Sequence, residues 1–185
     1  MMSTSSSPLP SRVKVWDPSV RLFHWSLVLS VASAWVLDDP RWLHRRIGYV
    51  VIGLIAFRLL WGVIGTRHAR WADFIPGPRR LIRYLSKMAR GREARTLGHN
   101  PAGAAMIVAL LALLTGICTT GVMMGMDRYF GQEWVDHWHK GLVNGLLVLI
   151  ALHLGGVALA SLRHRENLVA SMIHGHKMLH DPSAD

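Results

Sequence analysis

The sequence predicts an all-α integral membrane protein: a four-helix bundle with a cytoplasmic interfacial helix between the second and third helices. Four apolar runs occur along the chain, and each is close to the ~20 residues that a helix needs to cross ~30 Å of hydrocarbon. Only 17% of the 185 residues are charged, against about 25% in ordinary soluble domains. The chain also contains eight Trp, whose rings favour the membrane–water interface.

The domain organisation follows from where the polar segments lie. Residues 1–15 are polar and rich in Ser, so we expect a disordered cytoplasmic tail. Residues 16–166 form the predicted four-helix transmembrane domain. Residues 167–185 form the predicted cytoplasmic C-terminal tail.

The first apolar run covers residues 22–37 and is short, so we expect it to gain length from the amphipathic stretch before it. An alternative is a cleaved signal, because Ala32-Ser33-Ala34 resembles a signal-peptidase site. That run contains His24 and Trp25, which a disposable signal has no reason to carry. We therefore expect this segment to be retained as the first helix.

The second run covers residues 47–64 and is interrupted by Arg58. A long basic loop follows, in which apolar residues recur at helical spacing. They are Leu81, Ile82, Tyr84, Leu85 and Met88. This pattern predicts a short helix lying on the cytoplasmic membrane surface.

The third and fourth runs cover residues 101–124 and 141–162. Asn100 followed by Pro101 is typical of a helix start, because Asn caps the first turn and Pro is favoured at its first position. The loop between these two helices is the most acidic of the connections.

The formal net charge of +10 is carried outside the apolar runs. Such an excess points either to nucleic acid or to an anionic membrane surface. Because the basic residues gather in the tails and in the loop between the second and third helices, we predict membrane lipid and no nucleic acid as a partner. The positive-inside rule then places both termini in the cytoplasm.

Four of the 11 His lie within or at the ends of the apolar segments, where ionisable groups are costly and usually functional. At 1.5 Å per residue, they sort into two depths. His44 and His139 open the second and fourth helices and share an outer level. His24 and His153 share an inner level, about 21 Å away.

Two levels with two histidines each match two haems with paired axial imidazoles in a bundle core. Cys118 is the one cysteine, which excludes a C-x-x-C-H attachment site, so we expect non-covalent haem b. Gly48, one turn from His44, would leave room for a flat macrocycle. Arg21 and Arg58 are candidates for pairing with haem propionates, although Arg58 could instead reach toward the cytoplasm.

These residues resemble the bacterial cytochrome b561 family, which includes the cytochrome b subunits of nickel–iron hydrogenases. The motifs that carry the resemblance are Trp16-Asp17-Pro18, Arg21 with His24-Trp25, His44 with Gly48-Tyr49, Arg58-Leu59-Leu60-Trp61-Gly62, and Trp138-His139 with His153. The resemblance implies four helices, two b haems and exchange with the quinone pool in the inner membrane. It implies ligand roles for His24, His44, His139 and His153, paired His24–His153 and His44–His139.

Three functions stay open at this point. The first is a di-haem carrier without catalytic residues, moving electrons between quinone and a redox partner such as a periplasmic c-type cytochrome. The second is a stand-alone superoxide:quinone oxidoreductase, which needs a positive outer pocket to steer an anion. Candidates for it are Arg41, Arg45, Arg46, Arg128 and Lys140. The third is a non-haem metal transporter, whose histidines would bind its cargo.

Overall fold

The computed structural model describes residues 12–66, 69–92 and 100–178. Its four long helices are α1 (Pro18–Val36), α2 (Arg41–Ile64), α5 (Pro101–Met123) and α6 (Glu133–Arg163). The shorter elements are β1 (Arg12–Lys14), α3 (Trp71–Phe74), α4 (Pro78–Ala89), the 3₁₀ helix η1 (Asp127–Tyr129), α7 (Leu168–His174) and β2 (His176–Met178). All four long helices have the length and composition to cross a membrane, which confirms the predicted all-α four-helix membrane fold. The cytoplasmic interfacial placement of the helix between the second and third long helices stays a prediction.

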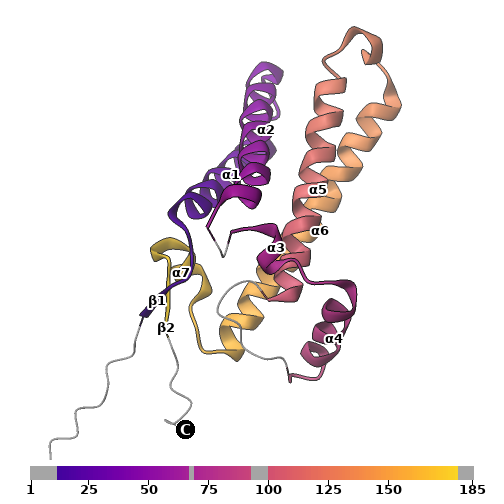
Figure 1. The fold of residues 1–185 in the computed structure, drawn as a ribbon. Coiled ribbons are helices and arrows are strands. Elements are labelled where there is room, and N and C mark those ends of the chain that lie inside the picture. The colour runs from indigo at the N-terminus through magenta and orange to yellow at the C-terminus, as the bar shows by residue number, and fades with distance from the viewer. Residues whose placement is uncertain (1–11, 67–68, 93–99, 179–185) are drawn as a thin grey trace, which may run out of the picture.

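The long helices form two hairpins, α1 with α2 and α5 with α6, and these are joined where α2 packs against α5 (Figure 1). We call the end with the α1–α2 turn and η1 the outer end. The inner end carries α4, α7 and the two short strands. Both ends of the described chain, at β1 and β2, therefore lie at the inner end.

The helix starts follow the local sequence. The Asn100 side chain accepts a hydrogen bond from the Gly103 backbone N–H at 2.6 Å, and Pro101 opens α5, which confirms the predicted cap. Asp17 caps α1 in the same way, accepting from the Ser19 N–H at 2.7 Å. These side chains satisfy donors that a helix start leaves without intrahelical partners.

Two helices begin six or more residues before the apolar runs that predicted them. α2 begins at Arg41 rather than residue 47, and α6 begins at Glu133 rather than residue 141. Arg, Glu and Lys are compatible with helix, so the backbone continues past the apolar segment into polar residues. An apolar run therefore marks the part of a helix that is suited to lipid and underestimates the length of the whole helix.

The interior of the bundle is small. Its buried cluster comprises Phe23, Val51, Ile55, Leu111, Leu114 and Leu146. By contrast, Leu22, Ile64 and Leu162 are 71%, 74% and 78% exposed. Helices that are apolar on their outward faces as well as their inward faces are suited to lipid rather than water.

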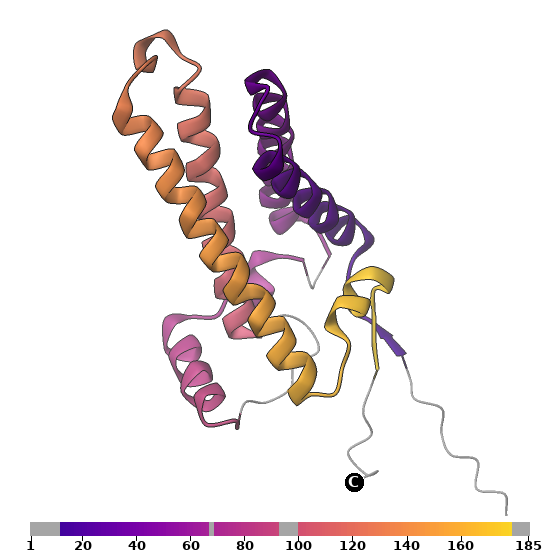
Figure 2. The ribbon, with the colours of Figure 1, turned by 180° about the vertical axis from the view of Figure 1, so that it is seen from behind.

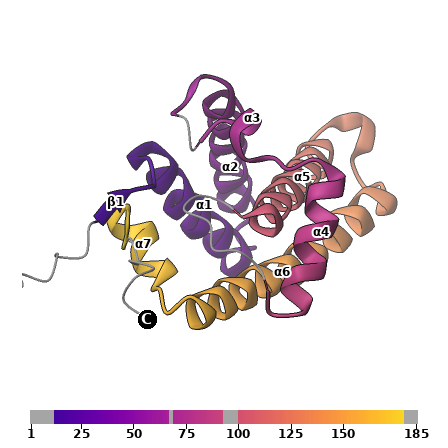
Figure 3. The same ribbon diagram turned by 60° about the horizontal axis from the view of Figure 1, so that its bottom comes forward.

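The chain segments at the inner end fold onto one another (Figures 2 and 3). β1 pairs antiparallel with β2, with Arg12 opposite Met178 and Lys14 opposite His176. α4 packs on α5, and Arg163 at the end of α6 donates from Nη1 to the Met88 carbonyl at 3.1 Å. Regular structure thus continues on both sides of residues 16–166, and the predicted domain boundaries stay predictions.

Candidate haem-binding sites

The outer level brings together two of the predicted histidines. His44 lies in the first turn of α2 and His139 lies in the second turn of α6. Their ring centroids are 6.3 Å apart and their planes are inclined by 68°. Residues 95 positions apart in sequence therefore face each other from different helices.

Each outer ring is held through its Nδ1 atom. Nδ1 of His44 lies 3.0 Å from the Ala34 carbonyl at the end of α1, so it carries the hydrogen and donates. Nδ1 of His139 lies 2.9 Å from Thr120 Oγ1. The Thr120 hydroxyl donates to backbone carbonyls of its own helix, so its oxygen accepts from His139. Both rings are thereby left with Nε2 as the unprotonated nitrogen.

This arrangement fits a metal held between two imidazoles. A metal–imidazole bond is about 2 Å long and the ring centre lies about 1 Å further, so two ligands of one metal have centroids about 6 Å apart. Metal-binding histidines typically donate their other N–H to a carbonyl or another oxygen. The outer pair has both properties, and its donor set of two neutral imidazoles is one that haem iron takes.

Small residues border the outer pair. A Cβ atom at Gly48, one turn from His44, would meet no atom within 4 Å. On α5, a Cβ at Gly121 would lie 3.4 Å from Cε1 of His139, so the helix backbone approaches that ring closely. The role predicted for Gly48 beside a macrocycle stays a prediction.

The inner level is looser. In the described structure no ring contact joins His24 on α1 to His153 on α6. Nδ1 of His24 is buried and has no hydrogen-bond partner. A buried polar atom without a partner is unusual in a folded protein and requires an explanation, such as a missing ligand. The His24 ring itself packs edge-on against Trp25.

The segment after α6 closes over the start of α1 beside His24. Trp25 Nε1 donates to the Met172 carbonyl at 3.4 Å, and Arg21 Nη2 donates to the Ile173 carbonyl. The backbone N–H groups of residues 15 and 16 both donate to the Gly175 carbonyl. We call this set of contacts between residues 15–25 and residues 171–175 the C-terminal clasp.

Arg21 and Arg58 have different surroundings. Arg21 lies one turn before His24, and its Nε is buried without a partner. Arg58 is only 2% exposed, donates from Nη1 to the Ala69 carbonyl at 3.2 Å, and stacks over the Trp71 ring at 4.1 Å. Arg58 therefore ties the start of the basic loop to α2, and a propionate role for it stays a prediction.

Several cations at the outer end contact residues close to them in sequence or space. Arg46 stacks over Trp42 at 5.1 Å, and Lys140 pairs with Asp136 at 2.8 Å. The guanidinium of Arg45 lies beside Gly125 at the end of α5. The anion-steering pocket considered from the sequence stays a prediction.

Sequence reasoning missed the residues that support the histidines. Thr120 lies in an apolar run, where a hydroxyl usually bonds back to its own helix, and nothing local marks it as a partner of His139. Ala34 contributes only a carbonyl, and the clasp lies in a segment predicted as a tail. These contacts are set by helix pairing, which composition and spacing do not reveal.

Comparisons with known proteins identify the family of this chain. The model of the prokaryotic cytochrome b561 family matches residues 15–175. A probable Ni/Fe-hydrogenase B-type cytochrome subunit of Bradyrhizobium diazoefficiens is 23% identical, over 91% of this chain and 87% of its own length. Similarly named proteins of Azotobacter chroococcum mcd 1 and Azotobacter vinelandii are 25% and 24% identical, over 94% of this chain and 91% of theirs. No solved structure matches.

The family match spans nearly all of the described chain, including the four long helices and all four candidate ligands. The b-type cytochromes of this family carry haem b and transfer electrons in a membrane. The four apolar helices of this chain provide the corresponding multi-pass scaffold. The chain therefore belongs to the prokaryotic cytochrome b561 family, as a membrane b-type cytochrome that functions in electron transfer.

Proposed function

We propose that this cytochrome binds two b haems, one between His44 and His139 and one between His24 and His153. It would carry electrons across the inner membrane between the quinone pool and a redox partner. The observation that carries this proposal is the outer pair, whose rings are 6.3 Å apart with both Nδ1 atoms engaged. Bound haem would supply a one-electron iron couple.

The side chains around the outer pair have separable tasks. His44 and His139 each present Nε2 as a ligand, while their Nδ1 bonds fix the orientation of the rings. The Ala34 carbonyl and the Thr120 hydroxyl increase the basicity of the imidazoles, because each accepts the Nδ1 hydrogen. With Cys118 as its one thiol, the chain would hold both haems by ligation and packing alone.

At the inner level, His24 and His153 would hold the second haem. The unpartnered Nδ1 of His24 supports a site that is completed by a bound group. Arg21, one turn away with its own Nε unpartnered, is the best-placed cation for a propionate. Arg58 lies in the inner half of α2, although its described contacts are with Ala69 and Trp71.

The partner would meet the outer end if the basic inner end faces the cytoplasm. That orientation is supported by the segments before α1, between α2 and α5, and after α6, which together carry most of the basic residues. Two classes of partner suit the outer haem: a periplasmic c-type cytochrome, and a hydrogenase-type enzyme like those named for the relatives. We propose a periplasmic redox protein, with quinone as the membrane-soluble counterpart.

The test is haem stoichiometry by pyridine haemochrome, with oxidised and dithionite-reduced spectra of the detergent-purified chain. We expect two b haems per chain. His44→Ala and His139→Ala should each leave only the inner haem, and His24→Ala and His153→Ala only the outer one. Reduction of the oxidised protein by a quinol would then establish the electron donor.

Two neighbouring histidines provide matched controls. His137→Ala, two residues from His139, removes an exposed ring that bonds only its own helix at Glu133, so both haems should stay. His164→Ala, just after α6, should also leave both. A single haem in the unmodified chain would overturn the two-site proposal, and a colourless protein would favour the transporter hypothesis.

A further inference from the structure

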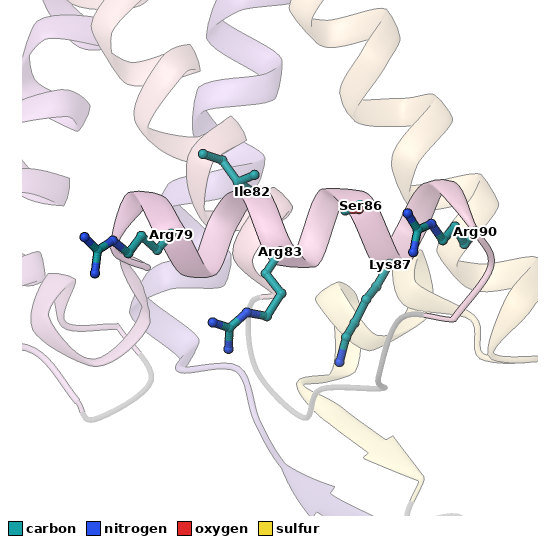
Figure 4. Close-up of a pocket in the computed structure, with 6 residues that line it drawn as sticks. All are labelled: Arg79, Ile82, Arg83, Ser86, Lys87 and Arg90. Atoms are coloured by element: carbon teal, nitrogen blue, oxygen red, sulfur yellow. The ribbon is translucent and has the colours of Figure 1, made fainter.

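Helix α4 presents a basic surface that the electron-transfer function does not use. Arg79, Arg83 and Lys87 recur along it at a spacing of four residues, and Arg90 follows directly after its last residue; Ile82 and Ser86 lie among them. They surround a shallow surface hollow of ≈ 500 Å³. Figure 4 shows Arg83 and Lys87 pointing away from the long helices, with Ile82 on the other side of α4.

The positive charge of this surface is not neutralised within the described part of the chain. α4 contains no acidic residue, and none of the four cations forms an ion pair with a residue that the structure describes. Like charges four residues apart on a helix repel each other. Arg79 and Arg83 form one such pair, and Arg83 and Lys87 form another. An anion in the hollow would relieve this repulsion.

The helix is fixed in place at the inner end of the bundle. Its Leu81, Tyr84 and Met88 side chains are partly buried, and α4 packs on α5. The hydrogen bond from Arg163 to the Met88 carbonyl joins it to α6. Because α4 connects the end of α2 to the start of α5, it lies where two membrane-spanning helices leave the hydrocarbon.

Two large apolar side chains of α4 are also exposed. Ile82 is 67% exposed and Leu85 is 40% exposed. A soluble acidic protein would account for the charge alone, whereas a lipid has both an anionic head and an acyl chain. Amphipathic helices that combine basic and apolar faces lie at the boundary between headgroups and acyl chains.

We propose that α4 binds an anionic phospholipid of the adjacent leaflet. The lipid phosphate occupies the hollow between Arg79, Arg83 and Lys87, and the acyl chain lies against Ile82 and Leu85. Bound lipid thereby holds α4 against the inner ends of α5 and α6. The inference rests on the membrane location of the chain and is independent of the number of haems.

The experiment is native mass spectrometry of the full-length, haem-loaded protein, released from detergent containing equal amounts of phosphatidylglycerol and phosphatidylcholine. We expect the unmodified chain to retain phosphatidylglycerol preferentially. Arg83→Gln/Lys87→Gln should lower that preference by roughly fivefold for each charge removed. Arg83→Lys preserves the charge and should retain the preference.

A matched control removes two exposed cations at the outer end, Arg41→Gln/Arg128→Gln. If this control weakens phosphatidylglycerol retention as much as the α4 variant does, overall charge is responsible and the site proposal is wrong. Equal retention of both lipids by the unmodified chain would also overturn it. The lipid proposal would also be wrong if an α4 variant kept its lipid but no longer bound an acidic polypeptide, because the surface would then be a protein-docking site. The haem spectrum of each variant reports whether it has folded.

Discussion

The outer and inner histidine pairs use the same residue type on helices of one bundle, yet the structure prepares them differently. At the outer level both rings are bonded through Nδ1, to the Ala34 carbonyl and to Thr120. At the inner level Nδ1 of His24 is buried without a partner. The outer rings are therefore oriented by groups of neighbouring helices, whereas the described structure gives Nδ1 of His24 no such partner.

Helix pairing explains the difference. α6 packs closely on α5, which supplies Thr120, and α2 packs on both α1 and α5, so the outer rings are positioned by neighbouring helices. α1 and α6, which carry the inner histidines, are not among the closely packed helix pairs of the described structure. Their inner ends are linked through the C-terminal clasp instead. A substitution that disturbs one histidine level should therefore leave the other level nearly unchanged.

The largest effect on this comparison is expected from Gly175→Val. Gly175 has φ +88°, and a Cβ there would lie 2.9 Å from Nη1 of Arg21 and 3.2 Å from the Trp16 carbonyl. Strain at such a position costs about 1–3 kcal/mol, and the contacts should open the clasp. We expect most molecules to lose the inner haem during purification while the outer haem stays, as measured by haem stoichiometry and redox titration.

Gly131→Val is the control for that substitution. Gly131 also has a positive φ, +73°, but lies at the outer end, and a Cβ there would meet nothing within 4 Å. It should lower the stability of the chain without selective loss of the inner haem. Equal inner-haem loss in both variants would show that strain in general, rather than the clasp, determines inner-site occupancy.

Thr120→Val is expected to have the next largest effect, on the outer level only. The substitution is nearly isosteric and removes the oxygen that accepts from His139 Nδ1. Loss of such a partner typically costs about 10–100-fold in metal-site affinity. We expect faster transfer of the outer haem to an apoprotein acceptor and a shifted outer reduction potential, with the inner haem unchanged.

Thr119→Val provides the comparison, because Thr119 donates only to the Thr115 carbonyl of its own helix. It should match the unmodified protein in both haem retention and potentials. If Thr119→Val and Thr120→Val behave alike, the Thr120 hydroxyl has no special role and the outer site is not oriented as we describe.

The helices and the depths of the histidines could be predicted from the sequence because they depend on local rules. Four apolar runs predicted four helices, and a rise of 1.5 Å per residue placed His44 and His139 at one depth, where their rings now lie 6.3 Å apart. Asn100 before Pro101 predicted a helix start that the structure confirms. The ligand roles of these histidines stay predictions.

What the sequence did not reveal depends on contacts between distant segments. Trp71 donates from Nε1 to the Leu59 carbonyl and covers Gly62, where any Cβ would overlap the indole ring. Arg58 stacks over the same Trp71, a contact that its position in the second apolar run could not show. The clasp likewise joins residues about 150 positions apart.

The smallest of these effects is expected from Trp25→Phe, which tests a single bond of the clasp. The change keeps an aromatic ring beside His24 but removes the Nε1–H that donates to the Met172 carbonyl. One such hydrogen bond contributes about 1 kcal/mol, so inner-haem dissociation should quicken by roughly fivefold while outer-haem dissociation stays constant. Trp35→Phe, on the same helix but 55% exposed, should change neither rate. An equal change at both haems after Trp25→Phe would contradict the separation of levels, because a contact at the inner end would then control a site about 21 Å away.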